Sequence, residues 1–191
     1  MKTRYSAVAV VLHWLIAVGI LYNLWVANLV WDDAHGPGRA SIELHKSIGI
    51  TVIGLFLLRI LWRVGHTPPP LLPAKRWEHK LATGIHHLLY LLMFLVPLAG
   101  WLHDSAWKAA ASHPLVLYGT VPFFRLPFFN GMTDAGKDHW HDVFGGVHAI
   151  SAKILMVLVA VHILGALKHQ FIDREPELQR MRIGRRPRPR A

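Results

Sequence analysis

Four long runs of apolar residues, each nearly free of charge, constrain the fold of this chain more than any other feature. They cover residues about 7–30, 47–64, 81–102 and 147–167. About 20 consecutive apolar residues are enough to cross the hydrocarbon core of a bilayer as a helix. Of the 191 residues, 53% are hydrophobic and 17% charged, whereas soluble domains have about 45–50% and about 25%. We therefore expect an all-α integral membrane protein that forms a four-helix up-and-down bundle.

Positive charge is distributed unevenly between the connections. The loop at 65–80 and the tail after the fourth run are dense in Lys and Arg, whereas the connections at 31–44 and 103–142 mix the two signs. The positive-inside rule then places both termini and the 65–80 loop in the cytoplasm. We expect residues 1–171 to form a multi-pass domain of the inner membrane and 172–191 a basic cytoplasmic tail drawn to acidic lipid headgroups.

Three general features narrow the function and the location of the chain. The net charge of +10 could suggest a nucleic-acid partner, but the charges lie at the ends of the apolar runs, which is the pattern of membrane topology. The first run is longer than the apolar region of a signal peptide and lacks a convincing cleavage site, so we expect it to be retained. Cysteine is absent, which excludes cysteine-ligated clusters and covalently attached c-type haem. Histidine must then carry any metal chemistry.

Six of the 14 histidines lie in the apolar runs or at their ends, where an ionisable side chain is costly and marks a candidate site. These are His13, His45, His86, His87, His148 and His162. His148 and His162 are separated by fourteen residues, which corresponds to about 21 Å along a helix and about 40° around it. One face of the fourth helix thus presents two imidazoles at opposite depths.

An up-and-down topology supplies a partner for each of these imidazoles. His13 lies toward the inner side and should face His162, and His45 lies toward the outer side and should face His148. Two stacked bis-imidazole sites are what two b-type haems require, since each iron needs an axial nitrogen on either face. Small residues near these positions would let a porphyrin approach the backbone, although each alone could serve helix packing: Gly19, Gly49, Gly54, Gly145, Gly146 and Gly165.

His86 and His87 are alternative candidates for the ligands on the inner side. They also lie near the inner side, so one of them could replace His13 or His162. Otherwise we assign them to contacts with haem propionates or quinone. A single membrane histidine is more often a hydrogen-bonded structural residue or a proton carrier, so the hypothesis depends on the four-histidine pattern. The histidines in the connections are expected to be solvated or interfacial, and two of them, at 139 and 141, are only a weak metal-binding signal.

Several short motifs occur here in a characteristic order. They are His13-Trp14, His45 with Gly49, His87-x-x-Tyr90, Pro97-x-x-Gly100, the segment Tyr118 to Pro122, and His148 with His162. Together they resemble the bacterial cytochrome b561 family from residue 5 to about 171. The resemblance implies an inner-membrane protein with four helices and two haem b groups, whose ligands come from the first, second and fourth helices. It also implies electron transfer with the quinone pool. The length and the external loop look like the superoxide oxidase branch, which passes electrons from periplasmic superoxide to ubiquinone.

This resemblance suggests roles for several cations. Lys46 and Lys153 flank the outer histidines and could attract superoxide or bind haem propionates, with Arg125 as a further candidate; lipid-headgroup contact is the alternative. Lys80, His86, His87 and His169 could supply protons to quinone if it binds on the inner side.

Two other functions fit the same sequence. The chain could be a cytochrome b membrane anchor that passes electrons for a partner dehydrogenase or hydrogenase. It could also be a histidine-rich divalent-metal transporter, but that function needs carboxylates inside the spans, and none lies between the ends of any predicted span.

Overall fold

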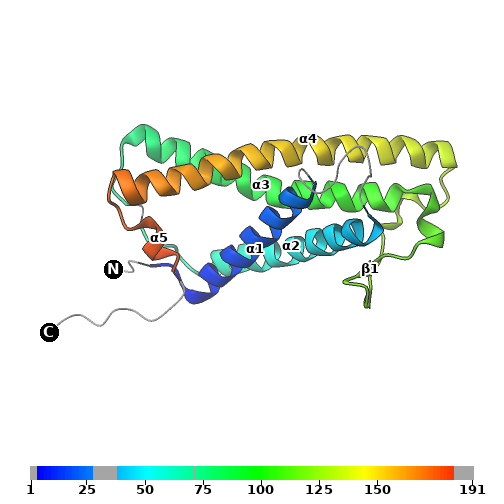
Figure 1. Cartoon of the computed structure of the whole chain (residues 1–191), viewed down its shortest axis with the longest axis horizontal. Helices are drawn as coiled ribbons and strands as arrows, with labels where there is room; N and C mark the ends of the chain where they lie inside the picture. The colour runs from blue at the N-terminus through cyan, green and yellow to red at the C-terminus, as the bar shows by residue number, and fades with distance from the viewer. Residues whose placement is uncertain (1–3, 28–37, 71, 183–191) are drawn as a thin grey trace.

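Four long helices dominate the computed structural model, which describes residues 4–27, 38–70 and 72–182 (Figure 1). They are α1 (Ala7–Trp25), α2 (Arg39–Gly65), α3 (Arg76–Ala106) and α4 (Asp134–Leu167). Each is long and apolar enough to cross a membrane, so the four predicted spans are confirmed. Residues 28–30 of the first predicted span lie outside the described residues.

Polar side chains cap the starts of three of the four long helices. Ser6 Oγ accepts a hydrogen bond from the Ala9 amide at the start of α1, and Thr133 Oγ1 accepts one from the Gly136 amide at the start of α4. At the start of α3, Glu78 accepts a hydrogen bond from the Lys75 amide at 3.1 Å. Such caps satisfy the free amides of a first turn outside the apolar run.

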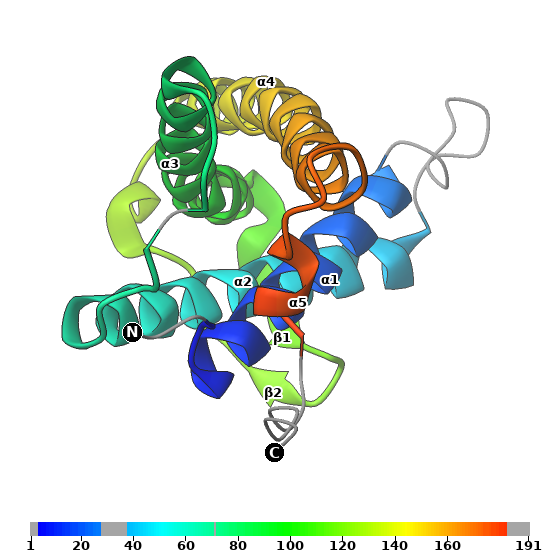
Figure 2. The same cartoon turned by 90° about the vertical axis from the view of Figure 1, so that its left-hand side faces the viewer.

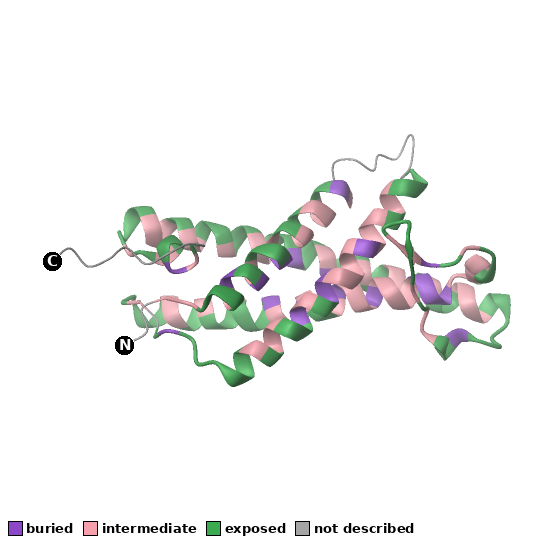
Figure 3. Cartoon of the chain, turned by 90° about the horizontal axis from the view of Figure 1, so that it is seen from below, coloured by how far each residue is buried: buried purple, intermediate pink, exposed green. Residues whose placement is uncertain are grey.

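The four helices pack as two pairs. α3 lies along α4 and α1 lies against α2, and α2 also contacts α3 (Figure 1). Leu89, Leu92 and Val96 of α3 form the main apolar cluster with Leu155 of α4. Only 11% to 17% of the most apolar window of each helix is buried, and Figure 3 shows exposed residues along all four helices. Most of the apolar surface therefore faces outward, as a lipid-facing surface does.

The connection between α3 and α4 contains no spanning helix. It consists of η2 (Lys108–Ser112), a hairpin of β1 (Val116–Leu117) and β2 (Val121–Pro122), and η3 (Pro127–Phe129). The hairpin turn has Tyr118 at φ 53° and Gly119 at φ 70°. A left-handed conformation is unfavourable for tyrosine, and contacts with α2 hold it: the Tyr118 amide donates to Ser47 Oγ at 2.9 Å, and the Tyr118 and Thr51 hydroxyls lie 2.6 Å apart.

The chain continues beyond α4 as a single π-helical turn, η4 (Lys168–Ile172), and the short helix α5 (Glu177–Arg180). α5 folds back over the beginning of α1, as Figure 2 shows. There Trp14 Nε1 donates to the Met181 carbonyl and Arg4 donates to the Arg182 carbonyl, both at 2.8 Å. The predicted tail at 172–191 is thus described as far as 182; the rest lies outside the described residues. We call this the α5 end of the bundle, and the opposite one, with β1 and β2, the hairpin end.

Candidate functional site

Four histidines form two pairs, and in each pair the rings of two helices that are distant in sequence face each other. His13 of α1 and His162 of α4 have ring centroids 6.3 Å apart at the α5 end. His45 of α2 and His148 of α4 have ring centroids 5.9 Å apart toward the hairpin end. Both pairs are those expected from the sequence, and α4 contributes one ring to each.

These distances can be compared with those of a metal held between two imidazoles. A metal-bound nitrogen lies about 2 Å from its ion and the ring centroid about 1 Å further out, so two opposed imidazoles have centroids about 6 Å apart. Both pairs match this separation, and the two rings of each pair are not stacked but lie at 71° and 82° to each other. The arrangement therefore fits a planar cofactor that takes one nitrogen from each side.

The ring of His148 is oriented by α3. Its Nδ1 lies 2.8 Å from the Val96 carbonyl oxygen, and since a carbonyl can only accept, Nδ1 must carry the proton. Nε2 then keeps its lone pair, which is the tautomer that a metal ligand needs. Gly100 makes room for the ring, because a Cβ at Gly100 would lie 3.0 Å from His148 Nδ1. Sequence reasoning missed these roles, although it singled out the Pro97-x-x-Gly100 motif.

A third histidine adjoins the pair at the α5 end. The ring centroid of His86 lies 5.3 Å from that of His162, closer than the separation of two opposed ligands. His87 points elsewhere, since its Nδ1 donates to the Thr83 carbonyl at 2.9 Å, and it is exposed. His162 thus faces both His13 and His86.

The glycines that could admit a porphyrin divide into two groups. A Cβ at Gly19 would meet Val52 at 3.0 Å, so this glycine allows α1 and α2 to approach closely. A Cβ at Gly145 would meet the His103 ring at 3.0 Å. By contrast, a Cβ at Gly54, Gly146 or Gly165 would meet no described atom within 4 Å. These last three glycines leave open space beside the helices.

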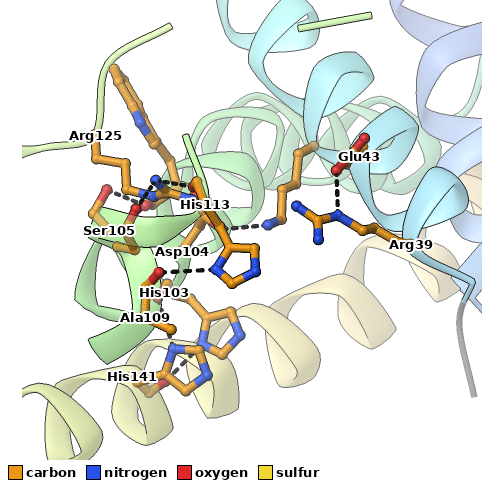
Figure 4. A network of polar contacts seen from close by, with 12 residues as sticks. Arg39, Glu43, His103, Asp104, Ser105, Ala109, His113, Arg125 and His141 are labelled. Carbon is orange, nitrogen blue, oxygen red and sulfur yellow. Dashed lines mark hydrogen bonds and ion pairs between the residues drawn. The ribbon is translucent and has the colours of Figure 1, made fainter. Parts of the chain in front are cut away.

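A cationic network lies at the hairpin end (Figure 4). The Asp104 carboxylate is buried and accepts from Lys46 on one oxygen and from Arg125 Nε, at 2.8 Å, on the other. Arg125 also donates to the carbonyls of Ala110 and His113. Lys46 and Arg125 share the single carboxylate of Asp104, so these three residues carry a net positive charge. Lys46 directly follows His45 in the chain, which places this charge beside the pair at the hairpin end.

Lys46 and Lys153, both expected beside His45 and His148, do not lie at one site. Lys46 is committed to Asp104. Lys153 is exposed and forms no ion pair with any described residue. It follows His148 by five residues, which places it about 140° around an ideal helix from that ring. Sequence reasoning missed Asp104, whose only signal is an acidic residue at the end of an apolar run.

The inner polar candidates are also dispersed. Lys80 is exposed. His169 Nδ1 lies 2.7 Å from an oxygen of Asp173, which also accepts from Lys168 at 2.8 Å. These two neighbours hold the pKa of the Asp173 carboxyl below its ordinary value, with the Lys168 hydrogen bond as the largest cause. Among the described residues, no contact joins Lys80 to His169 or to the paired histidines.

Two histidines predicted to lie in the connection between the third and fourth spans belong to α3 and α4 and contact each other. His103 and His141 stack with centroids 3.7 Å apart, and each Nδ1 donates to the other's carbonyl, at 2.8 and 2.9 Å. They are half-buried and fasten α3 to α4, a contact that the sequence did not predict. His139 takes no part in this contact. In the part of the chain that the structure describes, no group of three or more ligating side chains could hold a metal ion.

Comparison with known proteins agrees with this geometry. The sequence model of the family described as prokaryotic cytochrome b561 matches residues 4–184. The chain is 36% identical over 184 residues to cytochrome b561 homolog 2 of Escherichia coli, covering 93% of this chain and 90% of that protein. It is 28% identical over 194 residues to cytochrome b562 of Cereibacter sphaeroides, covering 93% and 94%.

A more distant relative carries a functional name. The chain is 22% identical over 196 residues to the probable superoxide oxidase CybB of Yersinia pestis, covering 95% of this chain and 97% of that protein. The family match spans nearly the whole chain, and the four helices are those of a multi-pass membrane protein. The chain therefore belongs to the prokaryotic cytochrome b561 family of haem b electron-transfer proteins in the bacterial inner membrane.

Proposed function

We propose that the chain holds two haem b groups and carries electrons between a donor at the hairpin end and the quinone pool. His13 and His162 would be the axial ligands of one haem, and His45 and His148 those of the other. The observation that carries this proposal is the separation of the paired rings, 6.3 and 5.9 Å, at two levels of the bundle. When bound, each haem supplies an iron that accepts and donates one electron at a time.

The protein's own residues define how such groups would be held. Val96 fixes the His148 tautomer through its carbonyl, and Gly100 leaves room for the ring. At the α5 end, Arg59 donates to the Ala9 carbonyl, one turn of α1 before His13, so its charge could compensate a propionate. The 5.3 Å contact between His86 and His162 supports a role for His86 beside the haem rather than opposite His162.

We further propose that the hairpin end is the periplasmic side and that superoxide is the donor. Two superoxide ions would release two electrons and leave as O₂, and one ubiquinone would take these electrons with two protons to become ubiquinol. The relative named as a probable superoxide oxidase supports this choice. So does the net positive charge of Lys46, Asp104 and Arg125, which favours the approach of a small anion. Protons for quinone would come from the α5 end, where Lys80, His86, His87 and His169 are the candidates.

The haem assignment is tested by a reduced-minus-oxidised spectrum with pyridine haemochrome quantification. We expect two haems per chain in the wild type, and one in each of His148→Ala and His162→Ala. His139→Ala is the matched control, since His139 is an exposed histidine of the same helix. Comparison of His13→Ala with His86→Ala identifies the second inner ligand. A colourless protein, or two haems retained in both α4 variants, would refute the assignment.

The donor needs a separate assay. A purified single chain that reduces ubiquinone with superoxide supports the proposed reaction. Reduction only when a dehydrogenase or hydrogenase subunit is present would instead assign the chain as a membrane anchor for that partner. Bound zinc in place of haem would favour the divalent-metal transporter.

A further inference from the structure

A basic cavity opens at the α5 end, and no histidine of the two facing pairs lines it. Its volume is about 310 Å³, and it lies between the beginning of α1, the end of α2 and the middle of α3. Four guanidinium groups line it, from Arg4, Arg59, Arg63 and Arg182. No carboxylate lines it, and none of the four arginines pairs with a carboxylate of the described residues. Four positive charges around one cavity predict an anionic occupant.

Neutral groups hold these arginines in place and leave their charge uncompensated. Arg59 donates to the Tyr90 hydroxyl at 3.1 Å and to the Ala9 carbonyl at 3.0 Å. Arg63 lies over the Tyr90 ring, 5.7 Å from its centroid. Arg4 uses one donor on the Arg182 carbonyl. A guanidinium has five N–H donors, so each arginine keeps several for a ligand.

The remaining lining carries no carboxylate and is largely apolar or aromatic, with Ser6 and Thr67 as its aliphatic hydroxyl groups. Trp62 stacks on His66 with ring centroids 3.7 Å apart, and Val10 and Pro69 are among the apolar lining residues. The helices that frame the cavity bury only 17% (α1) and 11% (α2 and α3) of their most apolar windows, so the cavity opens among lipid-facing helices. A ligand with an anionic head and an apolar body could place its head among the guanidinium groups and its body in the surrounding lipid. That combination suits an amphiphile.

We propose that this cavity binds the phosphate headgroup of an acidic phospholipid. Guanidinium forks match phosphate oxygens with two parallel hydrogen bonds. Basic pockets between transmembrane helices on the cytoplasmic side are suited to acidic headgroups, and this is the side to which the positive-inside rule assigns the α5 end. The acyl chains would extend into the lipid around α1 and α2. Arg59 is also the residue assigned above to a haem propionate, so the lipid site is tested through Arg63 and Arg182.

The bound lipid would also fasten the C-terminal segment. Arg182 belongs to the chain that folds back after α5, and this segment is held by hydrogen bonds from Trp14 to the Met181 carbonyl and from Arg180 to the Pro70 carbonyl. One phosphate between Arg63 and Arg182 would join α2 to that segment. The lipid would therefore add a further attachment between the C-terminal segment and α2.

Native mass spectrometry of the holoprotein in mild detergent tests the site. We expect wild type to retain phosphatidylglycerol in preference to phosphatidylcholine, and the double variant Arg63→Gln/Arg182→Gln to bind it about tenfold or more weakly, since each lost charge-assisted bond is worth about 1.5–3 kcal/mol. Arg76→Gln is the matched control, because Arg76 is an exposed arginine of the same end outside the cavity. Arg59 is left unchanged because it also adjoins the paired histidines.

Three results would overturn the proposal. Equal loss of lipid in Arg76→Gln would mean general surface attraction. Displacement of the lipid by inorganic phosphate at similar concentration would make this a free-phosphate site. A changed haem potential in the double variant with unchanged lipid retention would assign the arginines to a propionate. A second measurement needs no variant: phosphatidylglycerol should raise the thermal unfolding midpoint of wild-type protein more than phosphatidylcholine does. Because lipid is weighed directly, failure here is distinguishable from failure of the haem proposal.

Discussion

Substitution of Gly100 by alanine should disturb the haem at the hairpin end selectively. The added Cβ would lie 3.0 Å from His148 Nδ1 and 3.1 Å from Cε1, whereas an ordinary van der Waals contact begins at 3.4 Å. The ring must therefore move by several tenths of an ångström, away from the Val96 carbonyl that it now reaches at 2.8 Å. Loss of such a supporting hydrogen bond lowers metal affinity about 10–100-fold, which corresponds to about 1.4–2.8 kcal/mol.

The assay is a haem titration of the purified protein with a redox titration of each haem. We expect one haem to be lost at lower concentration of competing apoprotein, or to change potential, while the other is unaffected. Gly84→Ala is the matched control on the same helix, because a Cβ at Gly84 meets nothing within 4 Å. If Gly100→Ala retains both haems with wild-type affinity and potentials, the inferred support of His148 by α3 is wrong.

Three further changes test the hairpin end and the α5 end. Asp104→Asn removes the buried carboxylate that anchors Arg125, and breaking such a pair costs about 3–5 kcal/mol; the thermal unfolding midpoint should fall well below that of wild type, and an unchanged midpoint would contradict the anchoring role. Tyr118→Phe removes the hydroxyl contact to α2 while keeping the ring, so we expect a loss of about 1 kcal/mol and faster proteolysis of the hairpin, with no change if the contact does not form. The hydrogen bond from Lys168 lowers the pKa of Asp173, so the ion pair is intact at and above the ordinary carboxyl pKa and is lost only as pH falls through the lower pKa of the folded protein. Limited proteolysis after residue 173 should therefore accelerate only at such acid pH, whereas Asp173→Asn should show the faster rate at neutral pH. If Asp173→Asn behaves like wild type, the ion pair does not hold this segment in place.

The four spans could be predicted from the sequence because a helix that crosses a bilayer needs about 20 consecutive apolar residues. Each apolar run became a helix, and the pairs His13 with His162 and His45 with His148 followed from helical spacing and alternating direction. These rules depend only on rise per residue and topology. The helix ends were less predictable, because caps such as Thr133 act outside the apolar run.

The contacts within the connections could not be derived in the same way. Asp104 is buried only because Lys46 and Arg125 reach it from two other segments, and nothing in the sequence relates those positions. The reciprocal bonds of His103 and His141 need a backbone separation between α3 and α4 that no side-chain pattern encodes. Tertiary polar contacts of this kind depend on three-dimensional approach rather than on periodicity.

The position of His148 and His162 on one uninterrupted helix has a consequence for electron transfer through the proposed haems. Their separation of fourteen residues is fixed by the backbone hydrogen bonds of α4, at about 21 Å along its axis. Distances between residues of different helices depend on side-chain packing, whereas this one cannot change without breaking the hydrogen bonds of the helix. The spacing of the two ligands on α4 would thus stay constant however the other helices pack.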